Sequence, residues 1–224
     1  MRMFISSFYN TLIDKEEAIP FSTMLEIDKL RRKGILFSIC TNRSYKDVLY
    51  YNHDYQFIDY IISYNGNYIY DVIKEKCLYK KPLTKTIIKK VEDIFNNKEI
   101  ICYKEQDIIY KLEIKISNRE KDLINLLNDL DVSTSIFKYN NYYYLEIMMK
   151  NTYEGIKELL KKLKINNNET TTVIGNLSEK EVLDNINNSY VVSNAPKELK
   201  DLSNYKTKSN NSNGVEQVIK QIKQ

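Results

Sequence analysis

The sequence predicts an α/β protein with a parallel β-sheet core and a second, smaller α/β domain inserted into it. Residues 3–41 alternate a buried strand, an amphipathic helix and another buried strand, which is the order of a βαβ unit. The segment from residue 82 to 144 instead holds strands with one polar face, as antiparallel sheets do. The alternation of helix and buried strand returns after Lys150, so the middle segment interrupts a single core.

The first elements are the clearest. Residues 3–8 form a short apolar strand, and residues 22–33 carry apolar side chains at helical spacing, with Ser22 expected as the N-cap and Gly34 as the stop. The apolar run at 35–41 then predicts the next strand.

The rest of the first half continues this pattern. A polar loop leads from residue 42 into a helix, and residues 57–66 form a strand that ends in the Asn65-Gly66 turn. Residues 67–73 and 76–81 read as a hairpin.

The inserted segment is predicted to hold two amphipathic helices and four strands. The helices are expected at 84–97 and 118–130, and the strands at 100–104, 108–116, 134–139 and 142–149. The returning core then has helices at 153–164 and 178–186, strands at 170–175 and 189–193, a loop at 194–202, and a last helix after Gly214.

Composition excludes several classes of protein. The chain has 224 residues, 42% of them hydrophobic, and a formal net charge of +4, so one or two domains with a buried core are expected. No apolar run approaches the roughly 20 residues that span a bilayer, and residues 1–12 lack the features of a signal peptide. The lysines are scattered rather than gathered into a stripe. We therefore expect a cytoplasmic protein without membrane or nucleic-acid partners.

Cysteine and histidine usage limits the chemistry. Cys40, Cys77 and Cys102 form no CxxC pair, which argues against a disulfide framework or a zinc site, and we expect them as small buried hydrophobes. The single histidine, His53, lies in a polar stretch and is expected at the surface. Sites that pair histidine with serine, cysteine or further histidines are therefore not expected near the strand ends.

The order of motifs resembles the haloacid-dehalogenase (HAD) superfamily, specifically Cof-type phosphatases with a cap inserted after the third core strand. The resemblance rests on six collinear segments, at 4–12, 34–45, 62–71, 144–155, 173–200 and 209–215. It implies a doubly wound, Rossmann-like core formed by 1–79 and 150–224, with a shortened α/β cap at 80–149. The active site is then expected at the carboxyl ends of the strands, which the sequence places at Phe8, Thr41, Tyr64 and Gly175.

The resemblance also implies which positions carry chemistry. The family uses an aspartate nucleophile, a second aspartate as acid and base, a lysine, and carboxylates that hold Mg²⁺. Ser7 stands at the nucleophile position, Tyr9 at the acid/base position and Glu154 at the lysine position. The family's metal-binding positions correspond to Ser7, Tyr9, Asn176 and Lys180. The last two stand where the family's acidic motif has carboxylates.

Three positions keep the family's pattern. Thr41 retains the expected hydroxyl, and Asn42 follows it in a Thr-Asn-Arg run where the family often has Thr-Gly-Arg. Asn65 and Gly66 retain the substrate-loop pattern. We regard Thr41, Asn42, Asn65 and Gly66 as candidate substrate- or phosphate-binding residues.

These replacements predict a protein of the phosphatase fold that binds a small phosphorylated ligand or a protein partner without catalysis, and that needs no metal cofactor. A serine hydroxyl is a poor nucleophile without a base, and tyrosine, with a pKa near 10, is a weak base at neutral pH. The alternative is a Mg²⁺-dependent phosphohydrolase of small phosphorylated metabolites such as sugar phosphates. Its metal would depend on Glu179 or Glu181, because the acidic motif is followed by one residue fewer than usual.

Two smaller questions stay open in the sequence. Glu154 stands where the family has a lysine, and Lys180 stands where it has an acidic residue. Either the two side chains face one cleft and form an ion pair with exchanged charges, or the two substitutions arose independently. The nineteen tyrosines, among them Tyr142, Tyr143 and Tyr144, invite a binding surface. Alternation along a strand exposes some of them in any case, so the sequence names no interface.

Overall fold

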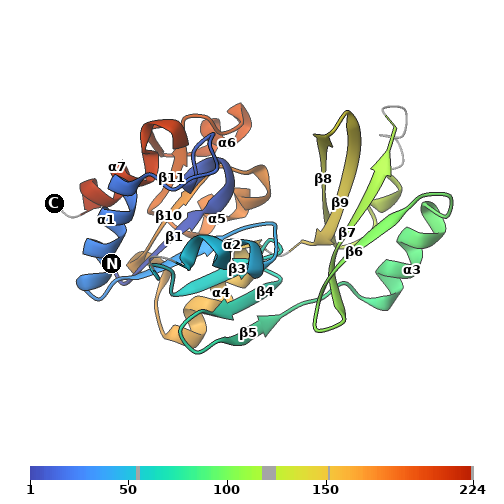
Figure 1. Ribbon diagram of the computed structural model, residues 1–224, viewed down its shortest axis with the longest axis horizontal. Coiled ribbons are helices and arrows are strands. Elements are labelled where there is room, and N and C mark those ends of the chain that lie inside the picture. The colour runs from blue at the N-terminus through green and yellow to red at the C-terminus, as the bar shows by residue number, and fades with distance from the viewer. Residues whose placement is uncertain (54–55, 118–124, 151, 223–224) are drawn as a thin grey trace. The chain divides into compact units, whose positions relative to one another are not determined.

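The computed structural model describes residues 1–53, 56–117, 125–150 and 152–222. The chain divides into two compact units (Figure 1). Unit 1 comprises Met1–Tyr79 and Thr152–Gln224, and unit 2 is the inserted Lys80–Asn151.

Unit 1 is built on an eight-stranded sheet of order β12-β11-β10-β1-β2-β3-β4-β5 (Figure 1). Its strands are β1 Met3–Ser7, β2 Leu36–Cys40, β3 Tyr60–Ser63, β4 Tyr68–Asp71, β5 Lys76–Lys80, β10 Thr170–Ile174, β11 Ser189–Val192 and β12 Tyr205–Thr207. The six strands from β12 to β3 run parallel, and β4 pairs antiparallel with β3. The predicted parallel α/β core is therefore confirmed.

The central strands β1 and β10 are buried along their whole length. This burial indicates that helices cover both faces of the sheet. The helices of unit 1 are α1 Phe21–Arg32, α2 Tyr45–Asn52, α4 Thr152–Leu163, α5 Lys180–Asn185, α6 Lys197–Leu202 and α7 Gly214–Ile222. α1 packs beside α7, and α4 packs beside α5. Their apolar faces and the strands form one core that includes Phe4, Phe37 and Val173.

Unit 2 has a four-stranded antiparallel sheet of order β6-β7-β9-β8 and the helix α3 Lys85–Ile94. The strands are β6 Ile100–Glu105, β7 Ile108–Ile116, β8 Val132–Tyr139 and β9 Tyr142–Met149. The Thr84 side chain caps α3 by accepting a hydrogen bond from the Ile87 amide, at 3.2 Å. Val91 and Phe95 belong to the same apolar cluster as Leu112 and Ile147, so one face of the sheet is apolar.

Several local predictions were wrong. α1 begins at Phe21, after Pro20, and Ser22 is not its N-cap but donates a hydrogen bond to the Glu216 carboxylate, at 2.5 Å. Residues 194–202, expected as a loop, contain α6, because Pro196 precedes a run too short to show helical periodicity. β12 was not predicted, since three residues at a sheet edge leave no periodic signal.

The predicted helix at 118–130 lies partly outside the described residues, and within the described part residues 125–127 form a 3₁₀ turn. Cys40 is buried as expected, whereas Cys77 and Cys102 are exposed on strands β5 and β6, so that expectation was wrong for two of the three. His53 is exposed. Among the described residues, none of the helices has the length and apolar character needed to cross a bilayer.

Candidate functional site

The candidate site lies where the direction of the strand order reverses, at the carboxyl ends of β1 and β10. From β1 the chain continues to β2 and β3 on one side, and from β10 to β11 and β12 on the other. In open α/β sheets ligands bind at such a switch point. Ser7, the last residue of β1, stands in register with Cys40, the last residue of β2, and Gly175 follows directly after β10.

A hydroxyl and a carboxylate meet at this point. The Ser7 hydroxyl donates a hydrogen bond to Glu179 Oε1 at 2.5 Å, joining residues that are 172 positions apart. Ser7 is 1% exposed and Glu179 is 3% exposed. The two side chains therefore form a contact buried from solvent at the end of the central strand.

The backbone after β10 holds Glu179 in place. Leu177–Glu179 forms a single 3₁₀ turn with Asn176 as its N-cap, and the Glu179 side chain folds back over that turn. Its Oε2 accepts hydrogen bonds from the amides of Asn176, at 3.1 Å, and Gly175, at 3.3 Å. One carboxylate oxygen is thus held by the backbone while the other faces Ser7.

Burial without a cation changes the ionisation of this site. Burial raises the pKa of the Glu179 carboxyl above its usual value, and the hydrogen bonds from Ser7 and from the two amides only partly oppose the shift. Burial also raises the pKa of the neighbouring Cys40 thiol well above its usual value, and the charge of Glu179 and a hydrogen bond to it add to the rise. The thiol therefore stays neutral and is a poor nucleophile.

Close packing leaves no room for a larger residue at the end of β10. A Cβ on Gly175 would lie 2.3 Å from Thr11 Oγ1 and 3.2 Å from Val192 Cγ2. Thr11 Oγ1 is buried and has no hydrogen-bond partner among the described residues. Thr11 belongs to the turn Phe8–Leu12, in which Asn10 has a φ of 58°. The chain after β1 is thus pressed against the chain after β10.

Tyr9 has a different environment. Its ring lies under the Arg43 guanidinium, with the guanidinium carbon 4.0 Å from the ring centroid. Partial burial raises the pKa of the Tyr9 hydroxyl above its usual value, although Arg43 opposes the shift. Tyr9 therefore stays protonated at neutral pH and is unsuited to act as a general base.

The candidate binding residues after β2 and β3 lie next to one another. The Thr41 hydroxyl accepts a hydrogen bond from the Arg43 amide at 3.1 Å, and the Thr41 carbonyl accepts one from the Asn65 amide at 3.0 Å. Asn42 follows Thr41 in this loop. Gly66 packs directly against α4, since a Cβ on Gly155 would lie 2.3 Å from the Gly66 carbonyl oxygen. The loops after β2 and β3 are therefore joined by backbone hydrogen bonds.

The proposed charge-swapped pair does not form. Glu154 is paired with Lys157, one turn further along α4, at 3.2 Å. Lys180 is paired with Glu198 of α6 at 3.5 Å. Each charge has a near neighbour on the surface, so the idea of a mutual Glu154–Lys180 pair was wrong.

Sequence reasoning missed three residues of this region. Asn194 donates a hydrogen bond to the Asn10 carbonyl at 2.8 Å and accepts one from the Asn210 amide at 3.1 Å. The Asn210 side chain donates to the Ile13 carbonyl at 3.0 Å. Cys40 beside Glu179 was read as a core residue only. The signal available was the asparagine that follows β11 and the one that follows β12, at the same edge as Ser7.

Metal ligands are sparse here. Within the described ranges, no group of three or more histidine, cysteine, aspartate or glutamate residues is arranged to hold a metal ion. At this edge Glu179 is engaged by Ser7 and two amides, Asn176 is an amide, and Lys180 carries a positive charge.

The fold and the position of this site define an open α/β protein whose candidate site lies at the switch point of its sheet. A family profile described as haloacid dehalogenase-like hydrolase matches residues 8–122 and 103–219. The chain therefore belongs to the haloacid dehalogenase-like hydrolase family.

Similar proteins agree with this assignment. A putative phosphatase of Streptococcus pyogenes serotype M6 is 24% identical over 255 residues and covers 94% of each chain. A haloacid dehalogenase-like hydrolase from Bacteroides thetaiotaomicron has a TM-score of 0.83 at 15% identity, covering 99% of both chains. One from B. subtilis also has a TM-score of 0.83, at 15% identity, with 98% of this chain and 99% of that chain covered. A HAD subclass IIB sugar phosphatase has a TM-score of 0.82 at 17% identity, with 100% and 99% covered. The solved structures show the fold.

Proposed function

We propose that this chain is a member of the family that does not hydrolyse phosphate esters and acts by binding a small phosphorylated ligand or a protein partner. The observation that carries the proposal is the buried contact between Ser7 Oγ and Glu179 Oε1, at 2.5 Å. At the position that the family resemblance gives to a nucleophilic aspartate, the chain has a hydroxyl, and the proton of that hydroxyl points to a carboxylate.

Both side chains of this contact already have hydrogen-bond partners within the protein. Ser7 and Glu179 are 1% and 3% exposed, and the second oxygen of Glu179 is held by two backbone amides. A phosphoryl group that reached Ser7 would have to displace a buried, hydrogen-bonded carboxylate of its own charge sign. Two effects oppose that displacement. The phosphoryl group and the carboxylate repel each other, and the Ser7 hydroxyl, the Glu179 carboxylate and two backbone amides would lose their hydrogen bonds.

The residues present do not fit the family's Mg²⁺. Mg²⁺ takes oxygen ligands in near-octahedral geometry and is usually bound through one or two carboxylates, together with phosphate and water. Here Glu179 is the carboxylate at the strand ends, and its oxygens already accept hydrogen bonds from Ser7 and two amides. The resemblance puts Lys180 where the family has an acidic ligand, and a lysine side chain, which pairs here with Glu198, supplies no oxygen to the metal.

The loops after β2 and β3 support a binding role for the same edge. Thr41, Asn65 and Gly66 keep the family's substrate-side pattern, Asn42 lies between Thr41 and Arg43, and Arg43 adds a positive charge over Tyr9. A threonine hydroxyl, backbone amides and a guanidinium are donors that suit a phosphate oxygen. This supports a phosphorylated small molecule as the ligand.

A turnover assay tests the lack of catalysis. We expect the purified full chain, with Mg²⁺ and p-nitrophenyl phosphate, to release p-nitrophenol no faster than the Ser7→Ala variant. Ser178→Ala is the matched control, because Ser178 is an exposed serine of the same loop that holds Glu179. Turnover that is lost in Ser7→Ala and kept in Ser178→Ala would overturn the proposal.

Thermal unfolding tests the binding role and the metal separately. We expect inorganic phosphate or glucose 6-phosphate to raise the unfolding temperature, and Thr41→Ala to reduce that rise. We expect Mg²⁺ alone to cause no rise. A Mg²⁺-dependent rise that disappears in Glu179→Gln would show that Glu179 is a metal ligand after all. If neither phosphate compound nor a protein partner in pull-down experiments binds, the binding role is wrong.

The alternative function is a Mg²⁺-dependent phosphohydrolase of small phosphorylated metabolites. One observation favours it: Ser7 does have a base, because a carboxylate of raised pKa accepts its proton. The names of the similar proteins point the same way. In that case Glu179→Gln would abolish turnover while leaving phosphate binding intact, and the two proposals make opposite predictions for the wild-type assay.

A further inference from the structure

Unit 2 has an open sheet edge at β8. In the part of the chain that the structure describes, β8 pairs with β9 on one side and with no strand on the other, and Figure 1 shows it as the outermost strand of its sheet. A free edge presents unpaired N–H and C=O groups to which another strand can bind. Proteins commonly protect such edges with short strands, bulges, prolines or lysines.

The three other edges of the two described sheets carry such protection. β12 is only three residues long. β5 begins at Lys76 and ends at Lys80, and Pro82 follows it. The register of β6 shifts between Tyr103 and Lys104. β8, by contrast, is eight residues long, contains no proline and pairs with β9 residue by residue without a shift. It is therefore the least protected of the four edges.

The side chains of β8 favour pairing with a further strand. Five of its eight residues are β-branched or aromatic, the types that are enriched in strands. Lys138 is its only charged residue, and the Lys138 ammonium lies 5.9 Å from the centroid of the ring of Tyr143, its cross-strand partner on β9. The charge is thus turned toward its own sheet and leaves the edge open.

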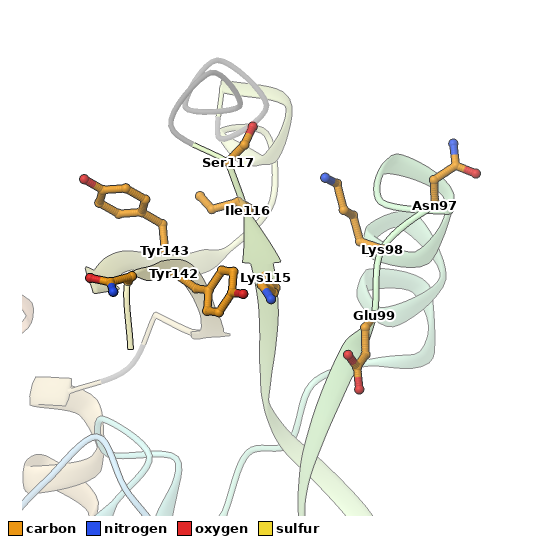
Figure 2. Close-up of a pocket in the computed structure, with 9 residues that line it drawn as sticks. Asn97, Lys98, Glu99, Lys115, Ile116, Ser117, Tyr142 and Tyr143 are labelled. Atoms are coloured by element: carbon orange, nitrogen blue, oxygen red, sulfur yellow. The ribbon is translucent and has the colours of Figure 1, made fainter. Parts of the chain in front are cut away.

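Exposed rings accompany this edge on one face of the sheet. Tyr139 lies opposite Tyr142, and Phe137 lies opposite Tyr144, with the Phe137 and Tyr144 rings stacked at a centroid distance of 5.5 Å. On the inner side, the Lys115 ammonium lies over the Tyr142 ring (Figure 2). On β8 itself, Phe137 and Tyr139 remain 37% and 62% exposed. A strand added beside β8 would remove part of this aromatic surface from water.

We propose that two copies of the chain pair antiparallel through β8 and join their unit 2 sheets into one. A two-fold axis perpendicular to the sheet then relates the copies, so that residues of the same face meet and every contact occurs twice. When the axis passes through Ile136, Tyr139 of one copy lies opposite Ser133 of the other, and Lys138 lies opposite Thr134. A second copy suits this edge because it brings the same two faces and because no two like charges meet.

Sedimentation equilibrium of the full chain tests this pairing. Two paired strands bury less than the roughly 1,600 Å² of a standard stable complex, so we expect a weak dimer that appears between about 5 and 500 µM. Tyr139→Lys adds a positive charge to the edge. One exposed charge is expected to change affinity by about threefold, and the symmetry places the change twice in the interface, so the dimer should weaken by about tenfold.

A matched control and a rescue locate the interface. Tyr205→Lys makes the same substitution at an exposed tyrosine of β12, the edge strand of the unit 1 sheet, and should leave association unchanged. Ser133→Glu/Tyr139→Lys should associate more tightly than Tyr139→Lys alone. Residues 133 and 139 lie six positions apart on one extended strand, so the new charges can meet only between two copies.

Three results would overturn the proposal. The first is a chain that stays monomeric over the whole concentration range. The second is association that is affected equally by Tyr139→Lys and Tyr205→Lys, or by neither. The third is a Ser133→Glu/Tyr139→Lys variant that associates no better than Tyr139→Lys. Unfolding temperatures close to that of the wild type will show that each variant is folded. Every residue that carries the proposal belongs to unit 2, so the pairing is independent of Ser7 and Glu179.

Discussion

The two units bury carboxylates in opposite ways. In unit 1, Glu179 is buried without a cation and is held by a serine hydroxyl and two backbone amides. In unit 2, Glu113 and Glu146 stand directly opposite each other on β7 and β9, and both accept hydrogen bonds from Lys111, at 2.5 and 3.1 Å. The ammonium is itself only 4% exposed, which makes this a buried three-residue network.

Neutral donors complete the network of unit 2. Tyr103 donates to Glu113 at 2.6 Å, Ser135 donates to Glu146 at 2.9 Å, and the Lys111 ammonium also lies 3.8 Å from the centroid of the Tyr103 ring. The five side chains of the network come from all four strands, so the network depends on the register of the whole sheet. Two of the three hydrogen bonds to Glu179 instead come from backbone amides directly before its own 3₁₀ turn. A buried charge can thus be compensated by a sheet or by a single turn.

Removing the cation of the unit 2 network should have the largest effect. Lys111→Met leaves two buried carboxylates opposite each other, and losing one partner of a buried ionic group typically costs about 3–5 kcal/mol. Denaturant unfolding, with hydrogen exchange of the β7 amides, measures the loss. Lys115→Met is the matched control on the same strand, where an exposed ammonium should change stability by less than about 0.5 kcal/mol. Equal effects of the two substitutions would show that the network does not stabilise unit 2.

Adding a side chain at Gly175, whose amide binds Glu179, should lower the stability moderately. The Cβ of Gly175→Ala would lie 2.3 Å from Thr11 Oγ1, and overpacking of this kind costs about 1–3 kcal/mol. In a Gly175→Ala/Thr11→Ala double variant the obstructing hydroxyl is gone, so part of the loss should be recovered. Chemical unfolding of both single variants and the double variant measures the coupling. If the two single changes in unfolding free energy simply add in the double variant, the added methyl group does not clash with Thr11.

The pH dependence of stability should distinguish Glu179 from a paired carboxylate. Its pKa in the folded state lies above the unfolded value of 4.5, so the folded protein binds the proton more strongly. Stability contributed by the protonated form is present below pH 4.5 and is lost as the pH rises through the folded pKa. Glu179→Gln should remove this decline, as measured by denaturant unfolding between pH 4 and roughly pH 8.

Glu216 provides a control of opposite sign. Burial tends to raise the pKa of its carboxyl, but hydrogen bonds from Lys220 and Ser22 outweigh burial and lower the pKa. Its contribution is therefore present above the unfolded pKa and is lost as the pH falls through the folded pKa. Glu216→Gln should flatten the acid side of the profile. The same change in slope for both variants would contradict the assignment.

The smallest effects are expected at the surface charges of unit 1. Glu154 and Lys180 pair with separate, exposed neighbours. Glu154→Gln and Lys180→Gln should each change the unfolding free energy by less than about 0.5 kcal/mol, and the two changes should add. A coupling clearly larger than the measurement error would revive a mutual pair.

Much of the fold was predictable from periodicity. β1, β2 and β10 are apolar runs of strand length, and α3, α4 and α7 follow helical spacing, so burial alone selects their structure. α6 and β12 were missed because six and three residues are too few to show a period. Ser22 failed as a predicted cap because a distant residue, Glu216, binds its hydroxyl.

The sequence by itself determined the parallel core, its interruption by a second unit, and the edge of the sheet at which β1, β2 and β10 end, next to Ser7, Thr41 and Gly175. These follow from local patterns, because the side-chain period of an element is set by its own residues. Only the tertiary structure decided that Glu179 meets Ser7, that Glu154 and Lys180 turn to other partners, and that Lys115 lies on Tyr142. Such contacts depend on how separate strands and turns are brought together, and a distance of 172 residues along the chain leaves no local trace.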